Sequence, residues 1–254
     1  KTKDLNNDKD TDDLTVSTLT VRESIAYDPV TGQMTGYTET QAKDNQSTTA
    51  IREDIVYNLL GQIKSYTDTI TSTLTPGLTQ TITFIADFPD SYNDKGQLFH
   101  YQETKSETGL GLDVTTITTR EAISYNDSGQ MSSYIETLDR DGQAKPQTTR
   151  SGITYNTLGQ IKYYQDVLTN LEGATDLITT VAFGYDGVQQ VLPTYDTKGR
   201  LLSYTEYKIE DDNDKTKDLN NDKDTDDLTV STTTTRSGID YNYFCQIIHY
   251  KDVS

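Results

Sequence analysis

The chain has 254 residues, only 32% of them hydrophobic, with no tryptophan and a formal net charge of -18. This negative field repels phosphate backbones and anionic lipid headgroups, so we expect neither nucleic-acid partners nor a role at a membrane surface. No apolar run approaches about 18 residues, so no membrane insertion is expected. The single cysteine, Cys245, excludes an internal disulfide framework.

An Asp-rich tract opens the chain and returns near its end. Residues 1–18 read KTKDLNNDKDTDDLTVST, and residues 215–232 repeat these letters at an offset of 214 (215 minus 1). An identity of this length does not arise by chance, so the chain carries a long internal repeat. Because repeats decide the fold, the rest of the sequence is interpreted within this period.

The tract places oxygen-bearing side chains at every second position, a pattern that suits calcium because this ion takes about six to eight oxygen ligands. It resembles the Asp-rich calcium loops of thrombospondin type 3 and dockerin-like modules. The alternative is a solvated linker, favoured by the lysines within the tract. With calcium as the candidate cofactor, the candidate ligands are Asp4, Asn6, Asp8, Asp10, Asp12, Asp218, Asn220, Asp222, Asp224 and Asp226.

A shorter unit recurs inside the period. Its skeleton is Arg-x-x-Ile-x-Tyr-Asn/Asp-x-x-Gly-Gln-apolar-x-x-Tyr-x-Asp/Glu. Its copies occupy residues 22–40, 52–69, 91–104, 120–137, 150–167, 194–207 and 236–253. The third and sixth copies lack the Arg and the Ile and follow the apolar segments 81–89 and 179–187 instead.

Each unit predicts one β-hairpin. Threonines and the alternating Ile-x-Tyr indicate a strand. Asn-x-x-Gly then predicts a tight turn with Gly in the left-handed region, and Gln-Ile-x-x-Tyr begins the return strand. Since one hairpin is not stable alone in water, neighbouring hairpins must supply its buried face.

The sequence therefore predicts an all-β fold of tandem hairpins, arranged as a meander, a spiral sheet or elongated β modules. The predicted parts are an Asp-rich junction and first strand (1–18), a three-hairpin module (19–112), a second one (113–209), an Asp-rich junction (210–228) and the first hairpin of the next period (229–254).

The sixth unit carries a more specific motif, Tyr195-Asp196-x-x-Gly199-Arg200-Leu201. It resembles the YD repeat of the RHS family, and the other units carry relaxed forms such as Tyr155-Asn156-x-x-Gly159-Gln160. The resemblance implies extracellular hairpin repeats that coil into sheets, found in toxin-holding shells and in adhesive wall proteins. Two departures are the longer spacing of the units and the replacement of Arg by Gln in most copies.

A recurring Arg and a recurring carboxylate predict cross-strand ion pairs; ligand binding by these arginines is the alternative. The pairs join Arg22, Arg52, Arg120, Arg150 and Arg236 to Glu39, Asp68, Glu136, Asp166 and Asp252. In the last copy, Cys245 replaces the turn glycine. Either this turn is remodelled or the letters there are in error.

We expect a structural subunit of an extracellular fibre, filament or adhesin stalk, with copies of itself as partners. No catalytic or cofactor-binding residue is predicted, and the chain is not expected to be an enzyme. The 44 threonines predict cross-strand ladders or O-glycosylation. One alternative function is a carbohydrate-binding module in which Tyr66, Tyr134 and Tyr164 stack on sugars, and another is a YD-repeat toxin-delivery shell.

Overall fold

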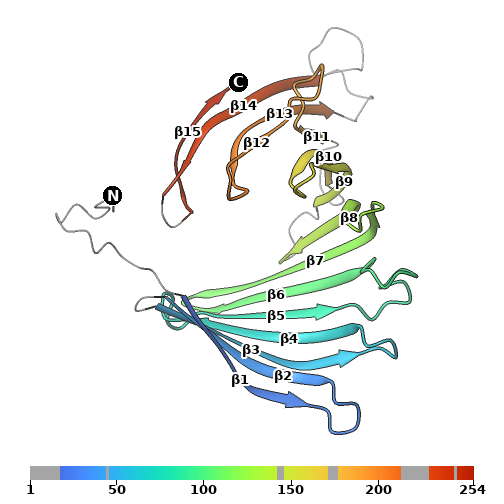
Figure 1. Ribbon diagram of the computed structural model, residues 1–254, viewed down its shortest axis with the longest axis vertical. Helices are drawn as coiled ribbons and strands as arrows, with labels where there is room; N and C mark the ends of the chain where they lie inside the picture. The colour runs from blue at the N-terminus through green and yellow to red at the C-terminus, as the bar shows by residue number, and fades with distance from the viewer. Residues whose placement is uncertain (1–17, 44–45, 142–145, 171–176, 213–228, 243–244) are drawn as a thin grey trace, which may run out of the picture. The chain divides into compact units, whose positions relative to one another are not determined.

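The computed structural model describes residues 18–43, 46–141, 146–170, 177–212, 229–242 and 245–254 (Figure 1). These residues contain fifteen β-strands and no helix, so no described helix could cross a membrane. The strands are β1 (Thr18–Tyr27), β2 (Met34–Lys43), β3 (Gln46–Tyr57), β4 (Ile63–Ser72), β5 (Thr79–Ile85), β6 (Tyr101–Gly109), β7 (Leu112–Tyr125), β8 (Met131–Arg140), β9 (Pro146–Tyr155), β10 (Ile161–Asn170), β11 (Leu177–Phe183), β12 (Thr194–Tyr195), β13 (Leu201–Asp212), β14 (Thr229–Tyr241) and β15 (Ile247–Val253). The predicted all-β fold is confirmed.

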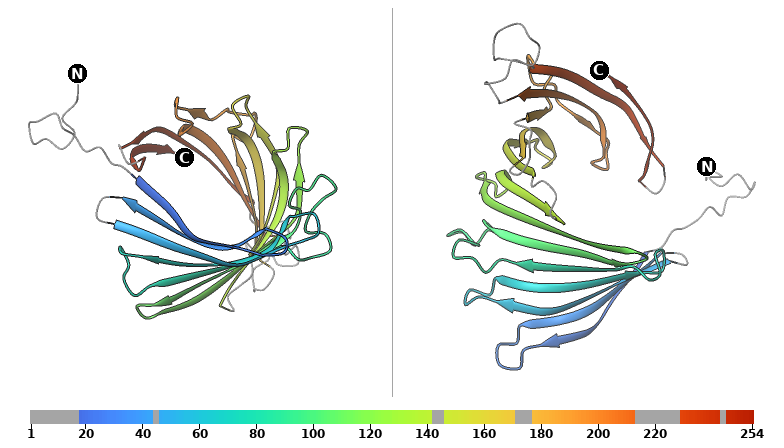
Figure 2. Two further views of the ribbon diagram at one scale, coloured as in Figure 1. Left: turned by 60° about the horizontal axis from the view of Figure 1, so that its bottom comes forward. Right: turned by 180° about the vertical axis from the view of Figure 1, so that it is seen from behind.

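The strands fall into two compact units. The first takes in the described residues up to Asp87 together with Glu103–Thr115, and in it β1 to β5 pair antiparallel in chain order. The second comprises Phe88–Gln102 and the described residues from Thr116 onward. In this unit β7 to β11 pair in chain order, followed by β13, β14 and β15, while β12 adds to β13. Figure 2 shows the strands of each unit side by side, which confirms the tandem hairpins.

The turns have the geometry that Asn-x-x-Gly predicts. In the second hairpin the Asn58 N–H donates to the Gln62 carbonyl (2.9 Å), and the Gly61 N–H donates to the Asn58 carbonyl (3.0 Å). The Asn58 side-chain oxygen accepts from the N–H groups of Leu60 and Gln62. Gly61 has φ +77°, which is accessible to glycine at no steric cost.

The last hairpin keeps the backbone hydrogen bonds of Asn242 and Cys245, although Cys245 stands at the glycine position. The Cys245 N–H donates to the Asn242 carbonyl at 3.0 Å, and Cys245 itself has φ +61°. Cys245 thus makes the backbone hydrogen bond that the turn glycine makes in other hairpins. It does so in a backbone conformation that side chains with a Cβ atom rarely occupy.

Each first strand that carries the Arg also contains a β-bulge that the sequence analysis did not predict. The residue two positions after the Arg has positive φ, and the strand register shifts beside it. These residues are Ser24 (+52°), Asp54 (+55°), Ala122 (+51°), Gly152 (+64°) and Gly238 (+60°). Alternation alone would put the Arg and the Ile three positions later on opposite faces of the strand. The extra residue of the bulge brings both onto the same face.

The hairpins without Arg are built differently. The apolar segments that precede them form β5 and β11, which pair with β4 and β10 of the preceding hairpins. Their Tyr-containing turns are small insertions: Tyr92 forms an isolated bridge to Leu98, and β12 has two residues. The lead-in strands, rather than the residues just before the turns, thus join these hairpins to their neighbours.

The core is a thin layer to which the Arg-containing hairpins contribute one isoleucine each. Ile55, Ile123, Ile153 and Ile239 are 1–7% exposed, whereas Ile25 of the first described hairpin is 41% exposed. In the second unit Ile123 and Ile153 pack with Tyr134. Because Ile25 differs from the others in having no described hairpin before it, burial of this isoleucine requires the preceding hairpin.

Candidate functional site

The most regular arrangement of side chains is a row of arginines and tyrosines that crosses each unit. We call it the Arg–Tyr ladder: the Arg of each first strand, the second Tyr of each second strand, and Phe84 and Phe183. The strand register fixes it, because Tyr37 lies opposite Arg52, Tyr134 opposite Arg150 and Tyr204 opposite Arg236. A hairpin that precedes an Arg-containing hairpin thus presents its second Tyr to that Arg.

Within each hairpin the Arg guanidinium lies over the ring of the second Tyr. The distances from the guanidinium carbon to the ring centroid are 3.7 Å for Arg52 and Tyr66 and 3.9 Å for Arg150 and Tyr164. The ring of the preceding hairpin is more distant, 5.8 Å for Arg52 and Tyr37. A cation over an aromatic face is stabilised by about 0.5–2 kcal/mol.

Phenylalanine takes the place of Arg where the repeat lacks it. Phe84 lies opposite Tyr66 and stacks on it at 5.0 Å between centroids, and Phe183 stacks on Tyr164 at 5.1 Å. Phe183 also contacts Tyr204 at 5.3 Å. Phe183 therefore continues the ladder from Tyr164 to Tyr204 within the second unit.

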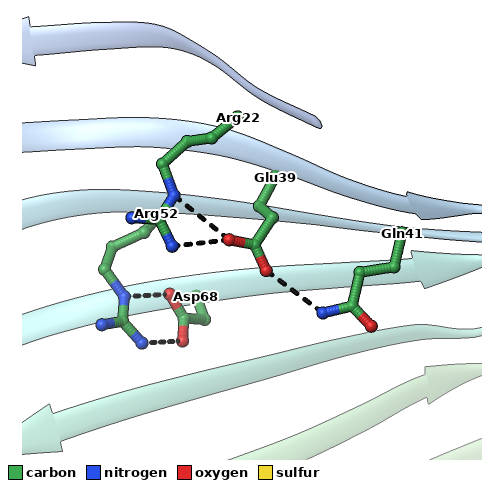
Figure 3. A network of polar contacts seen from close by, with 5 residues as sticks. All are labelled: Arg22, Glu39, Gln41, Arg52 and Asp68. Carbon is green, nitrogen blue, oxygen red and sulfur yellow. Dashed lines mark hydrogen bonds and ion pairs between the residues drawn. The ribbon is translucent and has the colours of Figure 1, made fainter. Parts of the chain in front are cut away.

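All five predicted ion pairs are present. Figure 3 shows two of them in the first unit, Arg22 with Glu39 and Arg52 with Asp68. The two residues of each pair lie directly opposite each other on neighbouring strands. Gln41 donates a further hydrogen bond to Glu39 at 3.2 Å. The other three pairs are Arg120–Glu136, Arg150–Asp166 and Arg236–Asp252. The prediction of repeated cross-strand ion pairs is confirmed.

Aspartate and glutamate bind the guanidinium differently. Asp68 accepts from Arg52 Nε and Nη2 with separate oxygens, at 2.7 and 2.6 Å, which is the two-bond fork geometry. Glu39 uses one oxygen for both Arg22 nitrogens, at 3.1 and 2.6 Å. The hydrogen bonds to Asp68 raise the pKa of Arg52 above its ordinary value. These bonds offset the partial burial of the guanidinium of Arg52, whose side chain is 24% exposed.

A second contact joins four of the described hairpins to the one before. The first Tyr donates its hydroxyl to the carbonyl of the residue that follows the turn Gln or Arg of the preceding hairpin. The distances are 2.6 Å for Tyr125 to Leu98, 2.7 Å for Tyr155 to Met131, 2.6 Å for Tyr195 to Ile161 and 2.8 Å for Tyr241 to Leu201. The first Tyr of the motif therefore holds neighbouring hairpins together.

The two polar residues that flank the turn also pair with each other. Asn58 donates its side-chain amide to Gln62 at 2.6 Å, and Asn156 does the same to Gln160 at 2.6 Å. In the sixth hairpin Arg200 Nε donates to Asp196 at 2.7 Å. In these hairpins the replacement of Arg by Gln accompanies the replacement of Asp by Asn, and each pair supplies one donor and one acceptor. The first hairpin differs, since it combines Asp28 with Gln33.

The tyrosines proposed for sugar stacking belong to the ladder. Tyr66 lies between Arg52 and Phe84, and Tyr164 lies between Arg150 and Phe183. Tyr134 is 9% exposed, with Arg120 and Arg150 near its ring. Neighbouring side chains thus occupy the ring faces that a sugar would need, which favours a role of these rings in the fold.

The proposed calcium ligands lie in 1–17 and 213–228, outside the described residues. Among the residues that the structure describes, no group of three or more His, Cys, Asp or Glu side chains could hold a metal ion. His100, one of two histidines, stacks on Phe88 at 4.0 Å and contacts Asp90 at 3.1 Å. Calcium binding by the Asp-rich tract stays a prediction.

Comparisons with protein-family models, with curated proteins and with solved structures find no significant match for this chain. The resemblance to YD repeats therefore rests on the sequence motif.

Proposed function

We propose that this chain is a structural subunit of an extracellular fibre, filament or surface adhesin stalk. The supporting observation is the repetition of one junction: four hairpins donate a Tyr hydroxyl to the same backbone position of the hairpin before them. A catalytic site is usually unique within a repeat protein, whereas a contact that recurs between successive hairpins serves to extend the array.

Electron microscopy of the purified chain tests this function. We expect unbranched filaments with a regular axial repeat, because tandem hairpins contact only their neighbours and can continue in one direction. Compact particles at every concentration, together with saturable retention on a glycan column, would instead support the carbohydrate-binding alternative.

Calcium is part of the proposal as a stiffening ion at the Asp-rich junctions. Oxygen ligands at alternate positions carry a dense negative charge that a divalent cation would neutralise. A chelator should then lower the melting temperature or increase protease cleavage near residues 1–13 and 210–228. If neither changes while the fibres persist, the junctions act without calcium.

A further inference from the structure

Two strands end the order of pairing among the described residues, and both expose apolar side chains. β1 lies at one end, with Leu19 62%, Val21 41%, Ile25 41% and Tyr27 58% exposed. β15 lies at the other, with Ile247 48%, Ile248 65%, Tyr250 47% and Val253 53% exposed. Exposed strand edges of this kind are templates for pairing with another strand.

The second copy of the repeat shows which neighbouring-strand contacts are not made by β1. The hairpins β1–β2 and β14–β15 correspond at the offset of 214, since Arg22 matches Arg236 and Tyr27 matches Tyr241. In β14 these residues contact β13: Arg236 lies 5.8 Å from the Tyr204 ring, and the Tyr241 hydroxyl donates to the Leu201 carbonyl. β1 therefore carries the first-strand half of a junction.

β15 carries the other half. At each Arg-containing junction in the second unit, the preceding second strand supplies a carbonyl and, three residues later, the Tyr that faces the Arg. Met131 and Tyr134 serve β9, and Leu201 and Tyr204 serve β14. β15 presents the same spacing with Ile247 and Tyr250.

We propose that β15 of one copy of this chain pairs antiparallel with β1 of a second copy, with Tyr250 opposite Arg22. This register would bring the Tyr27 hydroxyl to the Ile247 carbonyl and cover Ile25, whose counterpart Ile239 is 2% exposed. It also places Val21 opposite Lys251. The contact is head to tail and leaves the same two edges free at the ends of a dimer. Further copies add in the same way and form an open series where the rotation between copies does not close a ring. This inference rests on the proposed fibre function and specifies its contact.

Cysteine cross-linking tests the register. Each variant carries Cys245→Gly, which removes the native thiol and restores the turn glycine. Val21→Cys and Lys251→Cys are placed in separate chains, mixed and oxidised. Residues opposite each other across antiparallel strands have Cβ atoms about 4.5–5.5 Å apart, close enough for a disulfide once the strands adjust. We expect a disulfide-linked dimer in the mixture and none with either variant alone.

The matched control replaces Val21→Cys by Thr20→Cys. A shift of one residue moves the thiol to the opposite face of the sheet, so the dimer yield should fall about tenfold. Equal yields from both mixtures would overturn the register. A cross-link in Val21→Cys alone would show β1 pairing with β1, and exclusively cyclised monomer in the double variant Val21→Cys/Lys251→Cys would show closure within one chain. Either result overturns the proposal.

Sedimentation velocity of the unmodified chain provides a second readout. Ile25→Lys places a charge where the junction would bury an apolar side chain, so self-association should weaken at least about tenfold. Unchanged association would overturn the inference. Dimers without filaments would leave this junction in place and contradict the fibre function. Filaments without the Val21–Lys251 cross-link would support the fibre function and contradict this junction.

Discussion

At the residue scale, the bulge after the Arg is under unequal strain in different copies. The same left-handed conformation is occupied by glycine in two hairpins and by Ser24, Asp54 and Ala122 in the others. A Cβ atom makes this conformation unfavourable by about 1–2 kcal/mol. The strain persists because the bulge keeps the Arg and the Ile on one face, where both take part in the contacts between hairpins.

Exchange of glycine and alanine at the bulge should therefore change stability in opposite directions. Ala122→Gly relieves the left-handed conformation at an exposed position and should stabilise the protein by about 0.5–1 kcal/mol. Gly238→Ala should destabilise it by about 1 kcal/mol, although no atom lies within 4 Å of the added Cβ. Denaturant unfolding measures both. A destabilised Ala122→Gly variant would contradict the strain argument.

Sequence reasoning reached these residues only in part. The Arg–carboxylate pairs could be predicted because both partners recur at fixed positions, and the turn could be predicted because Asn and Gly have known turn roles. The bulge was missed although Gly152 and Gly238 stand inside strands, which is a recognised bulge signal. The change from Arg to Gln does not by itself predict the Asn–Gln pair, which becomes apparent only together with the change from Asp to Asn in the same hairpins.

The ion pair of the last hairpin predicts a pH dependence. The hydrogen bond from Arg236 holds the pKa of Asp252 below its ordinary value of 3.8. A carboxyl group with a lowered pKa stabilises the fold above its unfolded pKa, and this contribution is lost as the pH falls through the folded pKa. Glu206 has the opposite effect, since burial raises its pKa. The Asp252 contribution should therefore disappear only below about pH 4.

An NMR titration of the Asp252 carboxyl carbon measures this shift directly. We expect a midpoint below 3.8 in the native chain and a return to the ordinary value in Arg236→Gln. A midpoint that Arg236→Gln does not move would show that the guanidinium is not the cause.

At the element scale, the hairpin is the folding unit and its first Tyr is the connector. Tyr155→Phe removes the hydroxyl that donates to the Met131 carbonyl at 2.7 Å and keeps the ring, so it should cost about 1 kcal/mol. Tyr27→Phe is the matched control, because Tyr27 is 58% exposed and has no described hairpin before it. Denaturant unfolding of the two variants compares them, and an equal loss would contradict the role of the hydroxyl at the junction.

The elements themselves were predictable because the skeleton appears seven times in the sequence, so each copy supports the others. The third and sixth hairpins were harder, because their turns are insertions and their first strands are the lead-ins β5 and β11. The apolar character of these lead-ins was visible. Their place in the ladder depends on Phe84 and Phe183 standing opposite Tyr66 and Tyr164, which only the strand register reveals.

At the scale of the whole molecule, stability should vary along the chain. Each hairpin is buried mainly by its neighbours, so the chain behaves as a linear array in which the ends are least protected. Ile123 and Ile153 are 1% and 7% exposed within the second unit, whereas the described residues of β1 and β15 are exposed throughout. A single melting temperature would therefore average over segments of different stability.

Native-state hydrogen exchange should resolve this gradient. We expect the hydrogen-bonded amides of β8 and β9 to be protected by about 5 kcal/mol more than those of β1 and β15, because local opening at an edge exposes little apolar surface. Measured at increasing protein concentration, β1 and β15 should gain protection together if they pair between copies, while β8 and β9 stay unchanged. Uniform protection of all strands in dilute solution would show that the chain unfolds as one cooperative unit and would contradict the linear-array description.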